Sequence, residues 1–425
     1  MKNKFQHHRT VLLYLAFAFL TSLPLNLIAQ NQEGFTEYKG SVRDMETRKP
    51  IVFVDLIVKN TNISTVTNSE GEFALKIPHT VQNKVVQISH LGYETLEVLI
   101  SDYQNKTMQL ELEPAVTALP EVEVKAPKSA RSLVIKALDN KGKNYVTDNM
   151  LMTAFYRETI KKRRKNASLS EAVVEIYKQP YTSGRSDAVK LIKSRKSTNY
   201  SRLDTIALKL QGGPFSTLYS DLIKYPQYIF PQNDLSPYKF SFGKTTQVNN
   251  RRVYVVNFKQ KPEIERPLYY GKLYIDAENY ALTTAIYNLN LDNEEAAREM
   301  FIRKKPTRVK VTPTEASYRV NYRTQGGKWF YSYSNTLLTF KVNWKGKLFN
   351  SVYSLQSEMA VTDWEKNTTG ITKPKNALKP SVIFTDEASG FSDPEFWGEF
   401  NIIEPEKSIE SAIRKISRQV ERENS

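Results

Sequence analysis

Residue types that commonly carry out catalysis are scarce in this chain of 425 residues, which contains four histidines and no cysteine. A catalytic zinc ion takes three protein ligands, mostly imidazole and carboxylate groups, and keeps one position open for water. His7 and His8 lie in an N-terminal segment that we expect to be removed, which leaves His79 and His90. Neither belongs to a His-x-x-Glu pair, so we predict no metal site and assign both histidines to loops or strand ends.

The sequence supports nucleophilic catalysis and phosphate binding no better than it supports a metal site. A Ser-His-Asp triad would need one of the same two histidines, and a thiol nucleophile needs a cysteine. The chain has no G-x-S-x-G elbow and no G-x-x-x-x-G-K-[ST] loop. The glycine-rich stretch QGGPFS, residues 211–216, follows no strand–helix pattern, so we expect a loop there. The sequence therefore predicts no cofactor and no enzyme of these classes.

Carboxylates are abundant, and a pair of carboxylates can hydrolyse a glycosidic bond. The aromatic stretch PEFWGEF, residues 394–400, would suit stacking against a sugar ring, although such a segment more often packs in a core. A glycan hydrolase is therefore an alternative that residue types alone leave open. Its candidate acids are Glu158, Glu171, Glu175, Glu395 and Glu399.

The N-terminus has the pattern of a secretory signal peptide. Lys2, Lys4 and Arg9 precede an apolar run over residues 11–20, and Ala29 precedes a plausible cleavage point. We therefore expect an exported chain, in the periplasm or associated with the outer membrane. Without cysteine, such a chain cannot be a disulfide scaffold.

The expected mature chain is strongly basic. The full chain has 61 basic and 45 acidic residues, and the first 29 residues contain three of the basic ones, which leaves a net charge of +13. This charge favours anionic lipid, lipopolysaccharide or cell-wall polymer as a partner, with peripheral membrane contact, and no motif points to nucleic acid. One basic cluster, RKKPTRVK, spans residues 303–310. A second is predicted to lie in a hairpin turn and to contact anions or lipid: Lys161, Lys162, Arg163, Arg164 and Lys165.

The elements that would have to position these residues are mostly strands. Residues 36–125 contain about seven short stretches in which apolar and polar residues alternate, and this regular spacing predicts an antiparallel β-sandwich. The stretches STVTN and EFALKI flank a turn from Asn68 to Gly71, and we expect them to pair as a hairpin. Pro114, Pro120 and Pro127 then mark a linker.

A family resemblance is carried by VRDMETRKPIVFVDLIVKNTNISTVTNSEGEFALKIP followed by VVQISHLGYETLEVLI. This segment resembles the carboxypeptidase-regulatory-like domain, a transthyretin-like or Ig-like sandwich. The resemblance implies a non-catalytic accessory module, which in this family stands beside zinc carboxypeptidases and at the front of many outer-membrane proteins of the Bacteroidota. The positions that carry it are Gly40, Asp44, Thr47, Pro50, Ile51, Val54, Thr65, Thr67, Gly71, Phe73, Leu75, Pro78, Leu91, Gly92 and Tyr93.

A second β-rich region follows a short helix, which we expect over residues 129–146 with Gly142 as its stop. Long alternating stretches separated by turns, such as Gly326–Gly327, predict a large twisted antiparallel sheet. The order of a strand, a basic hairpin and a long insert resembles the curved half-barrel of periplasmic lipoprotein and lipid carriers. After Pro405, apolar residues recur on one face of an expected helix.

The sequence therefore predicts a mainly β fold, in which an N-terminal antiparallel sandwich precedes a large curved antiparallel sheet with a few helices. The favoured function is a non-enzymatic, exported cell-envelope protein whose module serves interaction or scaffolding. The alternatives are a periplasmic lipid or lipoprotein carrier, which would use an apolar concave face of the sheet, and the glycan hydrolase. The expected segments are a signal peptide (1–29), the sandwich (30–126), a linker and helix (127–148), the β-rich domain (149–400) and a C-terminal helix (401–425).

Overall fold

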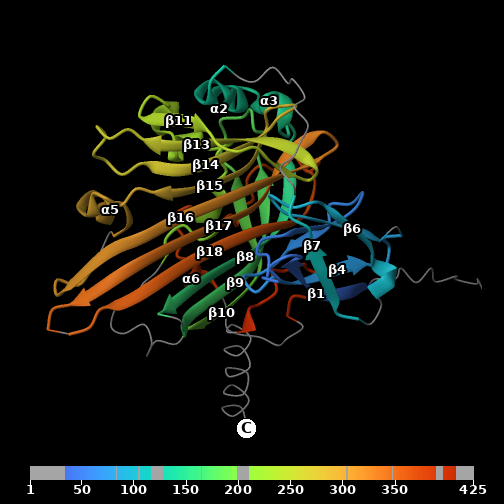
Figure 1. The fold of residues 1–425 in the computed structure, drawn as a ribbon. Coiled ribbons are helices and arrows are strands. Elements are labelled where there is room, and N and C mark those ends of the chain that lie inside the picture. Colours follow the sequence, from blue (N-terminus) through green and yellow to red (C-terminus); the bar gives the residue numbers. More distant parts are fainter. Residues whose placement is uncertain are drawn as a thin grey trace, which may run out of the picture.

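The structure, a computed structural model, describes residues 34–82, 84–103, 106–115, 128–163, 165–198, 210–302, 305–346, 348–388 and 396–407. Two small sheets at the N-terminal end are followed by one large antiparallel sheet (Figure 1). The predicted fold class is therefore confirmed. Among the described residues, no helix is both long enough and apolar enough to cross a membrane.

The N-terminal module is a sandwich of two sheets. Its elements are β1 (Phe35–Asp44), β2 (Asp55–Val58), β3 (Ser64–Val66), β4 (Glu72–Pro78), β5 (Val85–Ser89), β6 (Leu96–Leu99), η1 (Ile100–Tyr103) and β7 (Met108–Leu112). One sheet has the order β4-β1-β7 and the other β3-β2-β5-β6. The strand pairs are antiparallel except β1 with β7, which is parallel. Val42, Leu56 and Phe73 belong to the core of the sandwich.

The hairpin predicted around Asn68 and Gly71 is wrong. β3 and β4 flank this turn, but β3 pairs with β2 and β4 pairs with β1, so they lie in different sheets. The turn itself forms: Asn68 Oδ1 accepts hydrogen bonds from the backbone N–H groups of Glu70 and Glu72, and Gly71 has φ of 73°. The alternation of apolar and polar residues does not distinguish a hairpin from a connection between two sheets, because strands have the same two-residue period in both cases.

The large sheet has eleven strands, and its strand pairs are antiparallel. They are β8 (Met150–Lys162), β9 (Lys165–Lys178), β10 (Ala188–Thr198), β11 (Tyr238–Phe242), β12 (Thr246–Val248), β13 (Arg251–Gln260), β14 (Tyr269–Asp276), β15 (Leu282–Leu289), β16 (Val309–Gln325), β17 (Lys328–Trp344) and β18 (Ser351–Lys366). Their order is β10-β9-β8-β18-β17-β16-β15-β14-β13-β11, with β12 beside β13. The last strand thus pairs with the first, which joins the two ends of this region.

The helices described in the second region are short. They are α2 (Ala130–Asp139), α3 (Lys141–Asn144), α4 (Pro214–Leu218), η2 (Pro226–Tyr228), η3 (Pro231–Asn233), α5 (Glu294–Phe301) and α6 (Phe384–Glu387). A capping box starts α2, since Ser129 and Ser132 each accept a hydrogen bond from the other's backbone N–H. The helix predicted to end at Gly142 instead ends at Asp139, and Gly142 lies inside α3.

The two faces of the large sheet carry different cores, because successive residues of a strand point to opposite faces. On β8, Tyr156 belongs to the main core, whereas its neighbour Phe155 belongs to a separate cluster. We call the face that carries Tyr156 the inner face and the face that carries Phe155 the outer face.

The inner face is covered by the segment between β10 and β11. We call residues 210–237, which include α4, η2 and η3, the plug. Its apolar side chains share one core with residues of β9 and of β13, which lie near opposite ends of the strand order, so the sheet curves around the plug. The buried plug residues of this core are Phe215, Leu218, Leu222, Ile223, Tyr225, Ile229, Phe230 and Leu235.

The module lies on the outer face. Val66 of β3 and Phe53 share a cluster with Phe155 of β8 and Tyr333 of β17. Trp397 also belongs to this cluster, so the chain after α6 returns to the contact between module and sheet. The C-terminal helix predicted over residues 401–425 does not begin at residue 401, because residues 401–406 are not helical, and residues 408–425 lie outside the described residues.

Candidate functional site

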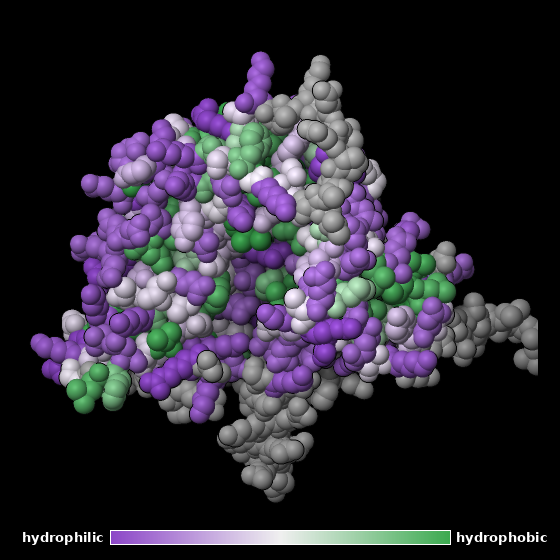
Figure 2. Space-filling model, in the orientation of Figure 1, coloured by the Kyte–Doolittle hydropathy of each residue, from purple (hydrophilic) through white to green (hydrophobic). Residues whose placement is uncertain are grey.

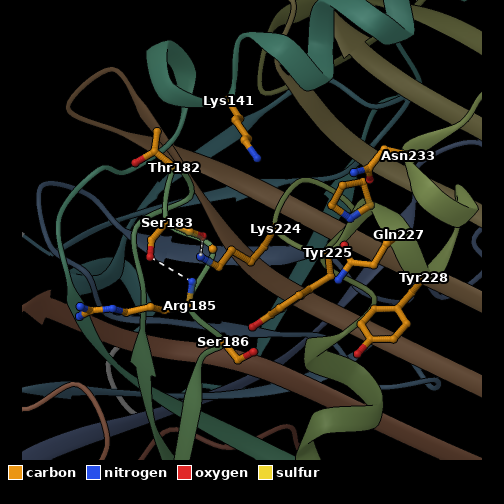
Figure 3. A pocket seen from close by; sticks show the side chains of 12 residues that line it. Lys141, Thr182, Ser183, Arg185, Ser186, Lys224, Tyr225, Gln227, Tyr228 and Asn233 are labelled. Atoms are coloured by element: carbon orange, nitrogen blue, oxygen red, sulfur yellow. Dashed lines mark hydrogen bonds between the residues drawn. The ribbon is translucent and has the colours of Figure 1, made fainter.

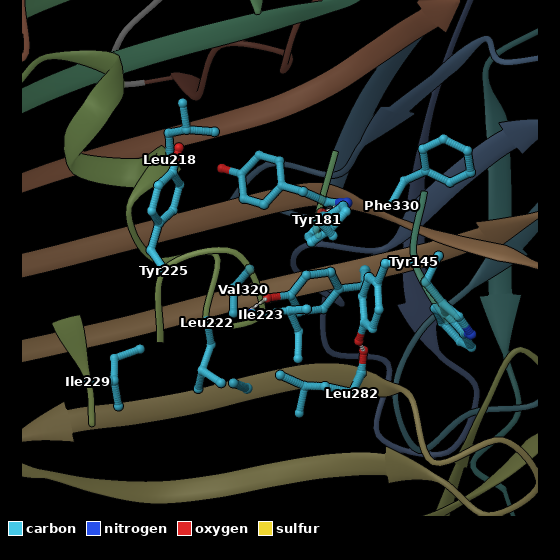
Figure 4. Packing of buried hydrophobic residues seen from close by; sticks show 14 of the residues in the cluster. Tyr145, Tyr181, Leu218, Leu222, Ile223, Tyr225, Ile229, Leu282, Val320 and Phe330 are labelled. Atoms are coloured by element: carbon cyan, nitrogen blue, oxygen red, sulfur yellow. Dashed lines mark hydrogen bonds between the residues drawn. The ribbon is translucent and has the colours of Figure 1, made fainter. Parts of the chain in front are cut away.

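The plug and the inner face form a packed core. Figure 4 shows Leu222, Ile223 and Ile229 of the plug beside Leu282 and Val320 of the sheet. Ile223 is fully buried, and Ile229 is 2% exposed. The part of the inner face that the plug covers is therefore filled by the chain's own side chains. A lipid could occupy this part only if the plug moved away.

A buried charge cluster fixes the plug to the sheet. The Nζ of Lys178, at the end of β9, donates hydrogen bonds to Asp187 Oδ2 at 2.8 Å and to Asp221 Oδ2, in the plug, at 2.7 Å. Burial alone would lower the pKa of Lys178, but the two carboxylates outweigh it and raise that pKa. The hydroxyls of Tyr225 and Tyr322 also donate to these carboxylates, at 2.7 and 2.9 Å. The cluster therefore ties β9, the plug and β16 together.

A second buried acid on the inner face is Glu158 of β8, which is 3% exposed. Its Oε1 accepts a hydrogen bond from the hydroxyl of Tyr156 at 2.6 Å. Burial raises the pKa of Glu158 to about 7, and the Tyr156 hydrogen bond opposes this only in part. Glu158 is thus a buried carboxyl group whose pKa lies well above the ordinary value for glutamate.

An open polar pocket of about 320 Å³ lies beside the plug (Figure 3). Lys224 Nζ donates to the backbone oxygens of Pro180 and Ser183, at 2.6 and 2.8 Å, which uses two of its three N–H groups. Burial lowers the pKa of Lys224 to about 8; the charges of Asp187 and Asp221 oppose this shift, and those of Lys178 and Lys141 add to it. The lining residues are Lys141, Thr182, Ser183, Gly184, Arg185, Ser186, Lys224, Tyr225, Pro226, Gln227, Tyr228 and Asn233.

This pocket has three cations and no carboxylate among its lining residues. Tyr228, which is 49% exposed, presents an aromatic ring that stacks on Tyr219 with the ring centres 5.0 Å apart. In Figure 3 the Lys141 side chain extends toward Lys224, whereas the Arg185 side chain extends away from it. The pocket suits a small anionic group, although the Lys224 contacts to backbone oxygens also hold the loop 180–183 in place.

The module and the sheet are joined by buried polar contacts. Arg323 of β16 donates to Ser64 Oγ of β3 at 2.5 Å and to the backbone oxygen of Val361 at 3.1 Å. Its guanidinium carbon lies 4.0 Å from the ring centre of Trp364. Burial raises the pKa of Asp55 to about 6, although the charges of Arg323 and Arg319 act in the opposite direction. Asp55 of the module and the two arginines of the large sheet, Arg319 and Arg323, therefore lie close together where the module contacts the sheet.

The segment 396–407 adds a second set of contacts. Asn401 accepts a hydrogen bond from the backbone N–H of Lys76 at 2.7 Å and donates to its backbone oxygen at 3.0 Å, as a neighbouring strand would. Lys76 Nζ also donates to the backbone oxygen of Gly398. Arg157 of β8 donates to the backbone oxygen of Ile403 at 2.7 Å. The module, the sheet and this segment are therefore interlocked.

Arg157 also belongs to an ion cluster on the outer face. Glu171 of β9 accepts from Arg157 Nε and from Arg195 Nε, both at 2.7 Å. Burial would raise the pKa of Glu171, but the two arginines outweigh it and lower that pKa. Arg157 is also 3.3 Å from Glu358.

The basic run predicted to contact anions lies in the β8–β9 hairpin, as expected, with Lys162 paired with Lys165. Arg163 and Lys165 are exposed, Lys161 makes an ion pair with Glu406 at 3.1 Å, and Lys162 Nζ lies 5.9 Å from the ring centre of Tyr353. Arg164 lies outside the described residues. The structure brings these residues together at one turn, and their contact with anions or lipid stays a prediction.

The carboxylates considered for glycan hydrolysis are dispersed. Glu158 lies on the inner face, whereas Glu171 lies on the outer face and is paired with two arginines. Glu175 makes an ion pair with Lys190 at 3.5 Å, and Glu399 is exposed. Glu395 lies outside the described residues.

The remaining chemical candidates have packing roles. Trp397 of PEFWGEF is 3% exposed and packs edge-on against Phe155, with Arg195 over its ring. His79 follows β4 and makes a hydrogen bond with Thr36, and His90 follows β5. Burial and the charge of Arg319 lower the pKa of His90 to about 3. Among the described residues, no group of three or more His, Cys, Asp or Glu side chains could hold a metal ion.

Sequence reasoning missed the Lys178–Asp187–Asp221 cluster and the pocket beside it. A lysine at the end of the apolar run AVVEIY was the available signal, but its partner Asp221 lies 43 residues further along the chain. Arg323 was missed for the same reason, since Ser64 precedes it by 259 residues.

Comparison with known proteins identifies the module. Residues 38–124 match the family model of the CarboxypepD_reg-like domain, which confirms the resemblance found in the sequence and fits a non-catalytic module. No curated protein matches the chain.

Two solved structures are similar to larger parts of the chain. One is a LolA superfamily protein from Nitrosomonas europaea, at 9% identity and a TM-score of 0.19, covering 56% of this chain and 95% of that one. The other is a DUF1329 family protein from Desulfovibrio piger, at 9% identity and a TM-score of 0.24, covering 57% of this chain and 95% of that one.

Proposed function

We propose that this protein is an exported, non-enzymatic component of a bacterial cell envelope, of the kind found in the Bacteroidota, and that it acts by interaction or scaffolding. The proposal combines the N-terminal signal pattern, the CarboxypepD_reg-like module and the basic charge of the chain. It places the protein in the periplasm or at the outer membrane. Its partner is an envelope protein, a lipid or lipopolysaccharide.

The observation that carries the proposal is the way the module is held on the outer face. Arg323 donates to Ser64, and Asn401 makes two hydrogen bonds to the backbone of Lys76. A module held this way is part of a larger rigid surface and is not a tethered domain that moves freely. Such a body suits a scaffold, which presents several surfaces in fixed relation to each other.

The plug bears on the lipid-carrier alternative. A carrier that uses the inner face needs room for an acyl chain, and the plug fills that region with Ile223, Ile229, Phe230 and their neighbours. Carriage there would require these side chains to leave the core, which exposes apolar surface to water at a cost of about 25 cal/mol per Å². The scaffold function needs no such opening.

Native mass spectrometry of the expected mature chain, residues 30–425, isolated from a periplasmic extract without detergent, tests the proposal. We expect the bare mass, or a mass that includes a protein partner. A discrete lipid adduct that is retained without detergent, which surface contact with a membrane would not preserve, would instead support the carrier. Reproducible turnover of peptide or glycan libraries, lost in a Glu158→Gln or Glu171→Gln variant, would contradict the non-enzymatic assignment.

A further inference from the structure

We propose that the tip of the β17–β18 hairpin inserts into the surface of an anionic lipid membrane. This goes beyond the proposed function, because it names the surface that makes the contact and the lipid chemistry that it takes. The described residues of the tip are 345–346 and 348–350. Its Leu348 and Phe349 are 95% and 79% exposed, the highest values among the large exposed apolar residues of the described chain. Turn positions normally carry small or polar residues, so two adjacent large apolar side chains here do not serve the turn.

The tip projects at one edge of the large sheet. β17 and β18 are 17 and 16 residues long, and their connecting end lies at the lower left of Figure 1. Figure 2 shows a patch of hydrophobic atoms at the same corner, beside hydrophilic ones. Val352, at the start of β18, is 39% exposed and extends this patch. The apolar group is therefore exposed at a projecting corner of the molecule, next to hydrophilic side chains (Figure 2).

Strand pairing brings basic residues to the same edge. Trp344 pairs with Val309, which places the start of β16 beside the tip, and Tyr353 pairs with Lys162, which places the β8–β9 turn nearby. Of the six exposed cations on this edge, only Lys310 has a carboxylate partner among the described residues, Glu294 at 4.0 Å. The six are Arg163, Lys165, Arg308, Lys310, Lys341 and Lys345.

Apolar side chains at a tip and cations around it match the layers of a membrane surface. Leucine and phenylalanine side chains bury in the acyl region, while lysine and arginine stay among anionic headgroups, each with a favourable electrostatic contribution. A nucleic acid would use the cations but would gain nothing from Leu348. An anionic lipid surface uses both, and for that reason we assign it as the occupant.

Vesicle sedimentation of residues 30–425 tests the proposal, with vesicles of phosphatidylcholine alone and of phosphatidylcholine mixed with phosphatidylglycerol. We expect binding to the anionic vesicles that weakens as salt increases. The double variant L348S/F349S should bind them at least about tenfold more weakly, since each side chain loses its burial in lipid. The matched control is L99S/I371S, which removes two apolar side chains of 47% and 48% exposure elsewhere and should bind like the wild type.

Quenching by brominated lipid gives an independent readout. Trp344 lies four positions before Leu348, whereas Trp329, Trp364 and Trp397 are each at most 5% exposed. Bromine in the acyl chains should quench part of the tryptophan emission of the wild type, and a Trp344→Phe variant should lose that quenching. Absence of wild-type binding to anionic vesicles would overturn the proposal and leave the scaffold function standing. Equal binding by L348S/F349S would also overturn it, because the contact would then lie elsewhere.

Discussion

Two buried ionisable side chains on the inner face are accommodated in opposite ways. The positive charge of Lys178 is compensated by two carboxylates at 2.7 and 2.8 Å, which raise its pKa, so Lys178 stays charged. Glu158 receives a hydrogen bond from Tyr156, and burial raises its pKa to about 7. The first group therefore resists a change of pH, whereas the second is sensitive to it. Both properties lead to measurable predictions.

The raised pKa of Glu158 predicts that the folded protein becomes less stable as pH rises. The pKa of Glu158 in the folded state, about 7, lies above the value of 4.5 for an exposed glutamate. The unfolded chain therefore releases this proton at lower pH, and the free energy of unfolding falls between pH 4.5 and 7 and then levels off. The stability of Glu158→Gln relative to wild type should rise by on the order of 3 kcal/mol from pH 4.5 to pH 8.

Urea unfolding of both proteins at pH 5 and pH 8 measures this difference. Glu175→Gln on the neighbouring strand is the control, because Glu175 is partly exposed beside Lys190. Parallel pH curves for wild type and Glu158→Gln would contradict the prediction.

We expect the folded protein to be strongly destabilised when the charge of Lys178 is removed and the two carboxylates remain. Lys178→Met leaves Asp187 and Asp221 buried without their cation, and loss of one partner of a buried ion pair costs about 3–5 kcal/mol. The triple variant K178M/D187N/D221N, which removes all three charges, should recover part of this loss. Lys190→Met, which removes a partly exposed ion pair, should cost less than about 1 kcal/mol. Denaturant titration would show whether the triple variant is as unstable as the single one.

At the scale of elements, the plug determines what the inner face can do. The side chains of the plug fill the concave inner face of the curved sheet. Asp221 of the plug also forms an ion pair with Lys178 of β9. The β17–β18 hairpin is the opposite case, since its tip exposes Leu348 and Phe349. The apolar residues of the plug thus form part of the core, whereas those at the tip of the β17–β18 hairpin are exposed and can contact a partner.

Substitution of Phe230 tests how much the packing of the plug contributes to the stability of the protein. Phe230 is fully buried, whereas Tyr228 on the same segment is 49% exposed. Phe230→Ala should cost about 3–5 kcal/mol of unfolding free energy, because it removes transfer energy and leaves a cavity. Tyr228→Ala is the matched control and should cost less than about 1 kcal/mol. Similar losses in the two variants, measured by urea unfolding, would show that the plug is not packed as the structure has it.

At the scale of the whole molecule, the module and the large sheet form one interlocked body. Arg323, Asn401 and Arg157 each bond a segment far away in sequence. Cooperative units are defined by such contacts and not by sequence boundaries. We therefore expect the module to share the stability of the sheet.

Calorimetry tests this coupling. The wild type should unfold in one transition, with equal calorimetric and van't Hoff enthalpies. Arg323→Met removes the bond to Ser64 and leaves Asp55 with less compensating charge, so the module should unfold separately at lower temperature. Arg298→Met in α5, whose partner is the exposed Glu295, should keep a single transition. Two transitions in the wild type would show that the two parts fold independently.

Local patterns were sufficient for much of the fold. Alternation predicted the strands and the β8–β9 hairpin, and the match over residues 38–124 confirms the module that was recognised from its turns and apolar positions. The apolar pair Leu348 and Phe349 follows KGK in the sequence, but no sequence pattern predicted that both side chains would be exposed. What failed was pairing: the turn from Asn68 to Gly71 joins two sheets, because alternation defines which face a residue takes but not which strand lies beside it.

The sequence by itself therefore determined the fold class, the identity of the module and the residue types available for chemistry, since these depend on composition and on short-range periodicity. The tertiary structure alone decided that Asp221 and Lys178 meet, that Glu158 is buried as an acid, that the plug fills the inner face and that Arg323 reaches Ser64. These contacts join residues 43 to 259 positions apart. Their formation depends on how the curved sheet brings distant strands together, which no local pattern specifies.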